Sequence, residues 1–221
     1  MKSKIFVCFI GIDGSGKSTL SQKISQRLSQ EGIKIKNPWA RYRPYLAKIM
    51  MTSGKKLFLD KNSNMHENYG SYLSDKRKVF KKMSSLSKIY FYTIKIEYFF
   101  EILFKIIIPF KFGTSIIADR YVHDTVINDL CIDINLPVSK LNQLLEKFWI
   151  LFPKPDITFL IKVPEEIAFK RKKSDIPSIG FLRIRNEYYE QLEGNEKIIT
   201  LDGTLPISEL EKQVLQEIKR V

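Results

Sequence analysis

Eight residues near the start of the chain carry the clearest chemical signal in the sequence. They read Gly11-Ile12-Asp13-Gly14-Ser15-Gly16-Lys17-Ser18, a full match to the Gly-x-x-x-x-Gly-Lys-Ser pattern of phosphate-binding loops. Glycines let successive backbone N–H groups turn inward and form a cradle for an anion at a helix N-terminus. We expect Lys17 to bridge the β- and γ-phosphates of a nucleotide and Ser18 to ligate Mg²⁺. The strand and helix patterns on either side argue against an ordinary glycine-rich turn.

A second signal, Asp119-Arg120-Tyr121, directly follows the apolar run 114–118. A carboxylate at the C-terminal end of a parallel strand faces the ligand crevice of an open α/β sheet. Asp119 could hold Mg²⁺ directly or through water, and Arg120 could clamp a transferring or acceptor phosphate. Alone, such a triplet would more often form an ion pair at a helix cap. Beside a phosphate loop in the same chain, we favour the functional interpretation.

A third signal is the basic run Lys170-Arg171-Lys172-Lys173, which leads into a loop containing Pro177 and then to Arg183 and Arg185. A basic helix end before such a loop could close over phosphates and supply charge only in the closed state. For any single residue, a solvated last turn that complements the helix dipole explains the pattern equally well.

The elements that must position these residues alternate along the whole chain. Strands are predicted for the apolar runs at 5–10, 114–118 and 157–163, for the alternating segment 33–36 and, as the last strand, for 198–201. Helical patterns fall between them, at 20–28, 141–149, 165–173 and 181–192, and a last amphipathic helix carries Leu210, Val214 and Ile218. This alternation predicts an α/β fold, a three-layer αβα sandwich around a five-stranded parallel sheet. No linker or repeat divides the chain, so we expect a single domain over residues 1–221.

Composition limits the partners and the compartment. The formal net charge of +13 favours anionic partners, which could be nucleotides, nucleic acid or an acidic membrane surface. Cys8 and Cys131 have no metal-like spacing, which argues against a disulfide scaffold or a zinc site and favours a reducing compartment. The run 5–10 is too short for a signal peptide and has no small-residue cleavage site after it. We therefore expect a cytoplasmic protein.

The segment 89–110 is the one stretch that could mimic a membrane span. It contains four charged residues, Lys95, Glu97, Glu101 and Lys105. A charge near the centre of a span costs roughly 2.5–3.5 kcal/mol, so we reject a transmembrane helix. Three of the charges are spaced by four and share one helix face. We expect a mostly buried or interface helix that ends near Pro109, with more apolar surface than one sheet face can cover.

The segment 52–88 differs from the rest of the chain. It is rich in Lys, Ser and Asn, carries an excess of basic over acidic residues and has few periodic apolar positions. We interpret it as a basic insertion, either partly mobile or folded into short helices over the body of the protein.

The three signals, in this order and spacing, resemble the thymidylate kinase family of nucleoside-monophosphate kinases. Residues 9–19 are similar to that family's opening, and 117–121 to its Asp-Arg-Tyr element. Residues 154–165 are similar to its Pro-Asp strand and the helix that leads to the lid, and 198–203 to its last strand and the turn near the adenine. The resemblance covers nearly the whole chain and implies a phosphate-loop NTPase fold with a short lid, here at 171–182.

The resemblance implies ATP- and Mg²⁺-dependent phosphorylation of a nucleoside monophosphate, with dTMP as the expected acceptor. It also implies a homodimer formed through the helix at 89–108. The expected catalytic residues are Lys17, Asp119, Arg120 and Arg171, and the expected Mg²⁺ ligands are Ser18 and Asp119. ATP would be held by the loop and the residue after it, which are Gly11, Asp13, Gly14, Ser15, Gly16, Lys17, Ser18 and Thr19. Acceptor contacts would come from Asp13, Arg41 or Arg43, Phe91, Lys95 and Arg120.

Departures from the family pattern shape these expectations. Some members carry an arginine in the loop at the position of Gly14, so catalytic charge here should come from the lid. Arg171 is the best candidate, with Lys172, Lys173, Arg183 and Arg185 as alternatives. Lys95 stands where the family has an arginine that contacts the acceptor, four residues after a base-stacking Phe91.

Two alternatives stay open. One is a kinase of the same fold that acts on another nucleotide, a nucleoside or a phosphorylated metabolite, which the altered acceptor side motivates. The other is a nucleotide-dependent binding protein without catalysis. Specific binding of nucleic acid is not expected, because basic and aromatic residues are not interleaved as in a stacking platform.

Overall fold

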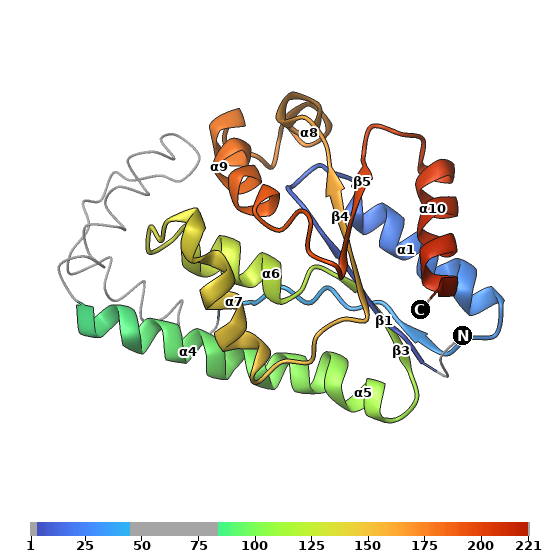
Figure 1. Ribbon diagram of the computed structural model, residues 1–221, viewed down its shortest axis with the longest axis horizontal. Helices are drawn as coiled ribbons and strands as arrows, with labels where there is room; N and C mark the ends of the chain where they lie inside the picture. The colour runs from blue at the N-terminus through green and yellow to red at the C-terminus, as the bar shows by residue number, and fades with distance from the viewer. Residues whose placement is uncertain (1–3, 45–83, 221) are drawn as a thin grey trace.

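The computed structural model describes residues 4–44 and 84–220, and its centre is a sheet of parallel strands (Figure 1). Within these residues, five strands pair in the order β2-β3-β1-β4-β5. Their bounds are Phe6–Ile10 for β1, Ile35–Lys36 for β2, Ser115–Asp119 for β3, Ile157–Lys162 for β4 and Ile198–Asp202 for β5. Each neighbouring pair is parallel, which confirms the predicted five-stranded parallel sheet.

Helices cover both faces of this sheet (Figure 1). On one face, α1 (Lys17–Gln30) and α10 (Ile207–Arg220) lie against each other and pack on the strands. The other face carries the remaining helical segments that contribute to the larger core cluster. These are α4 (Ser84–Ile102), η1 (Leu103–Ile107), α6 (Val122–Thr125), η2 (Val126–Cys131), α7 (Leu141–Trp149), α8 (Glu165–Arg171) and α9 (Ile179–Glu190). The arrangement is the predicted three-layer sandwich.

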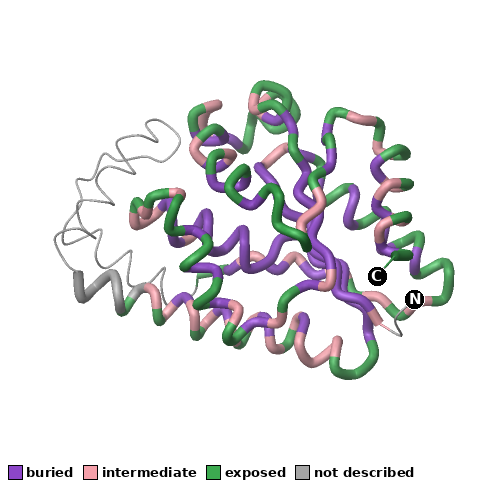
Figure 2. The backbone as a smooth tube through the Cα atoms, in the orientation of Figure 1, coloured by how far each residue is buried: buried purple, intermediate pink, exposed green. Residues whose placement is uncertain are grey.

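The pleat of β1 divides the core into these two layers. Val7 and Phe9 point to the layer of α1 and α10, whereas Phe6, Cys8 and Ile10 point to the other. Because both faces are covered, the strand is buried along its full length, as Figure 2 shows for the central strands. This explains why β1 appears in the sequence as a continuous apolar run and not as an alternating one.

The helix at 84–111 forms one long rod, in which α4 and η1 continue into α5 (Ile108–Lys111) (Figure 1). Its charged face contacts residues 39–43, the segment that follows β2. The Tyr42 hydroxyl donates to Glu97, and Lys105 contacts Glu101 and donates to the Trp39 carbonyl at 2.9 Å. None of the helices within 4–44 and 84–220 combines the length and the apolar character that a bilayer span requires.

The structure bears out the predicted end of this helix and also contains two helical segments that the sequence did not predict. The helix ends at Lys111, two residues after Pro109 and therefore near the predicted end. The π-helical turn η1 shifts the hydrogen-bond ladder and leaves the proline in the first turn of α5, where its missing N–H is tolerated. The helical segment Val122–Cys131, directly after the Asp-Arg pair, was not predicted. The short 3₁₀ turn η3 (Val138–Lys140) was also not predicted.

Of the predicted insertion at 52–88, only residues 84–88 fall within the described residues, where they form the first turn of α4. The remainder, 52–83, lies outside the described residues. In the predicted lid, 171–182, Arg171 is the last residue of α8 and Ile179 is the first of α9, so residues 172–178 connect two helices.

Candidate active site

The phosphate loop lies between β1 and α1, at the carboxyl end of the sheet (Figure 1). Lys17 is the first residue of α1, and Gly16 before it has a φ of 97°. Gly14, with a φ of 84°, lies so close to α8 that a Cβ there would be 2.3 Å from the carbonyl oxygen of Ala168. The loop therefore needs glycine at position 14 both for its backbone conformation and for the close approach of α8.

Lys17 is buried inside this loop, with 3% of its surface exposed. Its Nζ donates to the carbonyl oxygen of Ile12 at 2.7 Å. Burial and the positive charge of Arg120 together lower the pKa of Lys17 from its ordinary 10.5 to about 8, although the charge of Asp13 acts in the opposite direction. The site therefore holds a partly desolvated cation, which a phosphate would stabilise in its charged form.

Asp119 lies at the end of β3, in register with Phe9 of β1, so the strands bring it beside the phosphate loop. It is buried, and its Oδ1 has no hydrogen-bond partner among the described residues. The hydroxyl of Ser15 in the loop is buried without a partner in the same part of the chain. Such orphaned oxygens are costly unless something binds them.

The donor set fits Mg²⁺. The ion prefers a few protein oxygens and completes its octahedron with phosphate and water, and the Asp119 carboxylate with the Ser18 hydroxyl matches that demand. Within the described residues, no group of three or more His, Cys, Asp or Glu side chains could hold a metal without such help. Ser18 and Asp119 would therefore hold the ion together with the nucleotide.

Arg120 joins the loop to the sheet. Its guanidinium contacts Asp13 of the loop and donates to Asp124 of α6 at 2.7 Å. Burial alone would raise the pKa of Asp13, but Arg120, Lys17 and Arg41 outweigh it and lower that pKa far below its usual range. The backbone of Arg120 has a φ of 69°, a region that non-glycine residues rarely occupy and that often marks functional sites.

A buried polar network supports Arg120 from behind. The Tyr189 hydroxyl of α9 donates to the Asp124 carboxylate at 2.8 Å, and the Asn128 amide donates to the Asp124 carbonyl at 2.8 Å and to Tyr189 at 3.3 Å. Burial raises the pKa of Asp124, and Arg120 offsets part of that effect. These three residues were missed in the sequence. The spacing of four between Arg120 and Asp124 could have indicated the ion pair, whereas nothing in the sequence pointed to Tyr189 or Asn128.

Arg171, at the end of α8, reaches the phosphate loop as expected. Its Nη1 and Nη2 donate to the Gly203 carbonyl at 3.2 and 3.1 Å, and Nη1 lies 3.4 Å from the Gly14 carbonyl. Together these elements line a cleft of about 230 Å³. The residues lining it are Asp13, Gly14, Gly16, Lys17, Ser18, Thr19, Arg120, Arg171 and Lys172.

The other cations of the lid region have different surroundings. Lys172 lines the cleft and lies 3.7 Å from Asp175. Arg185 is buried, donates to the Phe181 carbonyl at 2.9 Å and covers the Phe181 ring at 3.4 Å. Lys173 and Arg183 are exposed. Among the predicted candidates, the structure thus brings Arg171 and Lys172 to the phosphate loop.

On the acceptor side, the two candidate arginines differ. Arg41 makes a bidentate pair with Asp129 of η2, at 2.9 and 2.8 Å, and its charge acts on Asp13. Arg43 is exposed and stacks on the Trp39 ring at 4.7 Å. Arg41 is therefore the one whose charge acts on the loop.

Phe91 and Lys95 are not brought to the cleft. The Phe91 ring meets Phe148 of α7 edge-on at 5.8 Å, and the Lys95 ammonium donates to the Lys147 carbonyl at 2.8 Å. Both side chains thus lie against α7, and their contact with an acceptor base stays a prediction.

Taken together, the sheet order, the phosphate loop after β1, the Asp-Arg pair after β3 and the arginine at the end of α8 define a phosphate-loop kinase fold. No protein-family model matches the chain. Curated relatives do match it. A thymidylate kinase of Fervidobacterium nodosum is 27% identical over 96% of this chain and 97% of its own length. A thymidylate kinase of Thermosipho africanus is 27% identical over 98% and 96%, and a probable thymidylate kinase of Sulfolobus acidocaldarius is 28% identical over 92% and 91%. The resemblance to the thymidylate kinase family is confirmed, and the chain is related to these proteins over nearly its whole length.

Proposed function

We propose that the protein is a nucleoside-monophosphate kinase that transfers the γ-phosphoryl group of ATP to dTMP with the help of Mg²⁺. The observation that carries this proposal is the convergence of three cations, Lys17, Arg120 and Arg171, on one small cleft at the phosphate loop. Phosphoryl transfer needs positioning and charge neutralisation more than covalent chemistry, and this cleft offers both. The relation to thymidylate kinases along nearly the whole chain supports dTMP as the acceptor.

Each residue then has a defined task. The backbone N–H groups of the loop and Lys17 hold the donor phosphates. Ser18 and Asp119 would hold Mg²⁺, which would supply further positive charge to the phosphates. Arg171 exchanges the carbonyl oxygens of Gly203 and Gly14 for phosphate oxygens, to which a guanidinium can donate two hydrogen bonds together. Arg120, fixed by Asp13 and Asp124, faces the acceptor phosphate.

The test is a panel of acceptors assayed for ADP release with ATP and Mg²⁺. The panel contains dTMP, the other deoxynucleoside and ribonucleoside monophosphates, and the free nucleosides. We expect dTMP to be the best acceptor and the Lys17→Ala variant to be inactive on all of them. Turnover of another acceptor with dTMP at background would overturn the acceptor assignment. Binding of ATP without transfer to any acceptor would favour the nucleotide-dependent binding protein instead.

One observation favours a second candidate, a kinase of the same fold with a different acceptor. Phe91 and Lys95, the expected contacts to the acceptor base, lie against α7, and Arg41 is already paired with Asp129. An acceptor base would therefore meet a different set of side chains from the one the family resemblance implies. The same panel separates the two candidates.

We also propose that the protein forms a homodimer through the rod at 89–108. Five large apolar side chains spaced by three or four residues are each more than half exposed along it. They are Ile89, Tyr92, Ile96, Phe100 and Phe104. A continuous apolar stripe of this kind typically marks an interface, and a two-fold contact between identical rods would cover it on both copies.

A cytoplasmic location is part of the same proposal. Within the described residues, Cys8 and Cys131 are both buried and free, which suits a reducing compartment. ATP and nucleoside monophosphates are also the partners that best account for the net charge of +13.

A further inference from the structure

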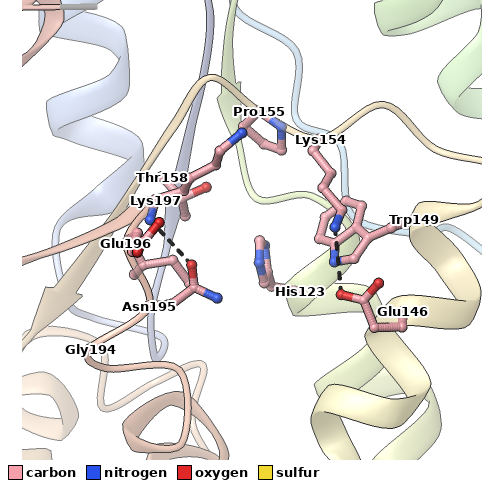
Figure 3. A pocket seen from close by; sticks show the side chains of 11 residues that line it. His123, Glu146, Trp149, Lys154, Pro155, Thr158, Gly194, Asn195, Glu196 and Lys197 are labelled. Atoms are coloured by element: carbon pink, nitrogen blue, oxygen red, sulfur yellow. Dashed lines mark hydrogen bonds and ion pairs between the residues drawn. The ribbon is translucent and has the colours of Figure 1, made fainter.

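A second pocket lies at the amino-terminal end of β4 and β5, opposite to the end that carries the phosphate loop (Figure 3). It has a volume of about 510 Å³, which is within the range of small-molecule sites. Its lining comes from α6, α7, the segment before β4 and the turn before β5. It shares no lining residue with the cleft at the phosphate loop.

His123 of α6 is the unusual residue of this pocket. It is 5% exposed, and its Nδ1 has no hydrogen-bond partner among the described residues. Burial lowers its pKa to about 4, so the imidazole is neutral at pH 7 and offers one donor and one acceptor. A buried polar atom without a partner destabilises the protein. His123 itself lines the pocket, so its imidazole is the polar ring that a ligand there would contact.

The walls beside His123 suit a planar ring. Trp149 packs edge-on against the imidazole, with the two ring centroids 5.1 Å apart. Figure 3 shows the imidazole between Trp149 on one side and Asn195 on the other. The Asn195 Oδ1 accepts from the backbone N–H of Lys197 at 3.2 Å, which turns the amide into a fixed polar group at the rim. An aromatic heterocycle could therefore contact Trp149 and hydrogen-bond to the imidazole and the amide.

Two lysines give the pocket its charge preference. Lys154 and Lys197 approach from opposite walls (Figure 3). Lys154 lies 3.5 Å from Glu146, but both side chains are at least half exposed. Such a surface ion pair contributes little free energy, so an acidic ligand can take the place of Glu146. Glu196 also lines the pocket, at an exposed position in the turn. An acidic group between the two lysines would gain charge-assisted hydrogen bonds from both.

We propose that this pocket binds a small heteroaromatic anion, with its ring against Trp149, its ring edge on His123 and its acidic group between Lys154 and Lys197. The site is separate from phosphoryl transfer, so the proposal stands independently of the acceptor. It predicts a ligand of the class of a pyrimidine or pyridine carboxylate.

The test uses the side-chain ¹⁵N resonances of histidine, because the chain has only two histidines, His66 and His123. The full-length protein is titrated with orotate and, separately, with nicotinate, and the His123→Phe variant assigns the signal. We expect the His123 resonances to shift and saturate at one site. Lys154→Met and Lys197→Met should each weaken binding about tenfold. Lys219→Met, which removes an exposed lysine of α10, should leave the affinity unchanged.

Three results would overturn the proposal. The first is the absence of any His123 shift with either probe at millimolar concentration, which would mean that the pocket holds water only. The second is a shift that does not saturate. The third is an equal loss of affinity in Lys154→Met, Lys197→Met and the Lys219→Met control. Thermal unfolding of each variant confirms that it is folded, and the ADP-release assay is read separately, so failure here leaves the kinase proposal untouched.

Discussion

Lys17 combines two properties that oppose each other in the free protein. Its position in the loop requires a positive charge for phosphate binding, yet its burial works against that charge. We expect Lys17→Ala to lower kcat by about 10³-fold or more, because transition-state charge would lose its fixed cation, while the fold survives. Steady-state kinetics with circular dichroism as a folding control measures this. An unchanged kcat in a folded variant would contradict the assignment of the donor site.

The lowered pKa of Lys17 predicts that stability and ATP affinity change with pH in opposite directions. Because the pKa of Lys17 is about 8 when folded and near 10.5 when unfolded, the unfolded chain binds more protons between those values. This residue's contribution to the free energy of unfolding should therefore rise with pH across that window, by at most about 3 kcal/mol. ATP affinity should instead fall above pH 8, since the cation is lost.

Denaturant unfolding and ATP titration at pH 7.5, 8.5 and 9.5 test the two trends. Lys17→Met is the matched control, because it has no proton to lose at this position. A slope that persists unchanged in Lys17→Met would show that other groups cause it.

Arg171 is the second residue whose role can be tested alone. Within the part of the chain that the structure describes, its guanidinium donates to the carbonyl oxygens of Gly14 and Gly203. We expect Arg171→Ala to lower kcat by about 10²-fold, with ATP affinity changed only a few-fold, because the guanidinium acts on charge that develops during transfer. Arg171→Lys should recover little, since an ammonium cannot make the same bidentate contact.

The matched comparison is Lys172→Ala, whose side chain lines the same cleft. If Lys172→Ala lowers kcat strongly and Arg171→Ala leaves it unchanged, the lid supplies the catalytic charge, but from Lys172 and not from Arg171. An unchanged kcat in both variants would contradict a catalytic role of the lid.

At the scale of elements, the link between α6 and α9 matters most. Tyr189 of α9 donates to Asp124 of α6, which in turn fixes Arg120. We expect Tyr189→Phe to destabilise the protein by about 1–2 kcal/mol, since a buried carboxylate loses a donor. It should also lower kcat several-fold with little change in the KM for ATP, because Arg120 loses its fixed position.

Asn128→Ala, which removes the other donor to this network, serves as the comparison for Tyr189→Phe. If both variants lose stability and neither loses kcat, the network is structural and does not position Arg120.

The elements also show what the sequence could predict. Strands β1, β3 and β4 are continuous apolar runs because helices cover both faces, and that pattern is visible without a structure. The segment Val122–Cys131 is different. It is almost fully buried and contains a π-helical stretch, so it shows neither an amphipathic period nor a cap that would mark a helix.

The residues of the candidate site likewise fall into those that the sequence predicts and those that it does not. Lys17, Asp119 and Arg120 are placed by local motifs, at the start of α1 and at the end of β3. Lys17 and Arg120 line the same cleft, and the charge of Asp119 acts on Lys17. The support of Arg120 by Tyr189 depends on a contact of α9 with Asp124 of α6, between residues 65 positions apart in the sequence. No local pattern encodes such a contact, and the same holds for the approach of Lys95 to Lys147.

At the scale of the whole molecule, the exposed apolar stripe on the helix at 89–108 is the surface through which we propose that the dimer forms. Phe100 is 55% exposed and belongs to that stripe. We expect Phe100→Glu to convert the proposed dimer into a monomer near 26 kDa, because dimerisation would bury the new charge in an apolar contact without a partner. Sedimentation at micromolar concentration measures the mass. Gln213→Glu on α10 is the control, and a monomeric unmodified protein would contradict the dimer.

The packing of α8 against Gly14 limits which substitutions the phosphate loop can accept during evolution. A Cβ at position 14 would collide with the Ala168 backbone, so an arginine supplied by the loop and an arginine supplied by α8 are mutually exclusive in this arrangement. Gly14→Arg should therefore fail to rescue Arg171→Ala, although it restores a positive charge within a few residues of the one removed. A change from an arginine on α8 to an arginine in the loop is therefore epistatic. The helix α8 must first move away from position 14 before the loop can accept a side chain there, and no single substitution at position 14 or 171 achieves both changes.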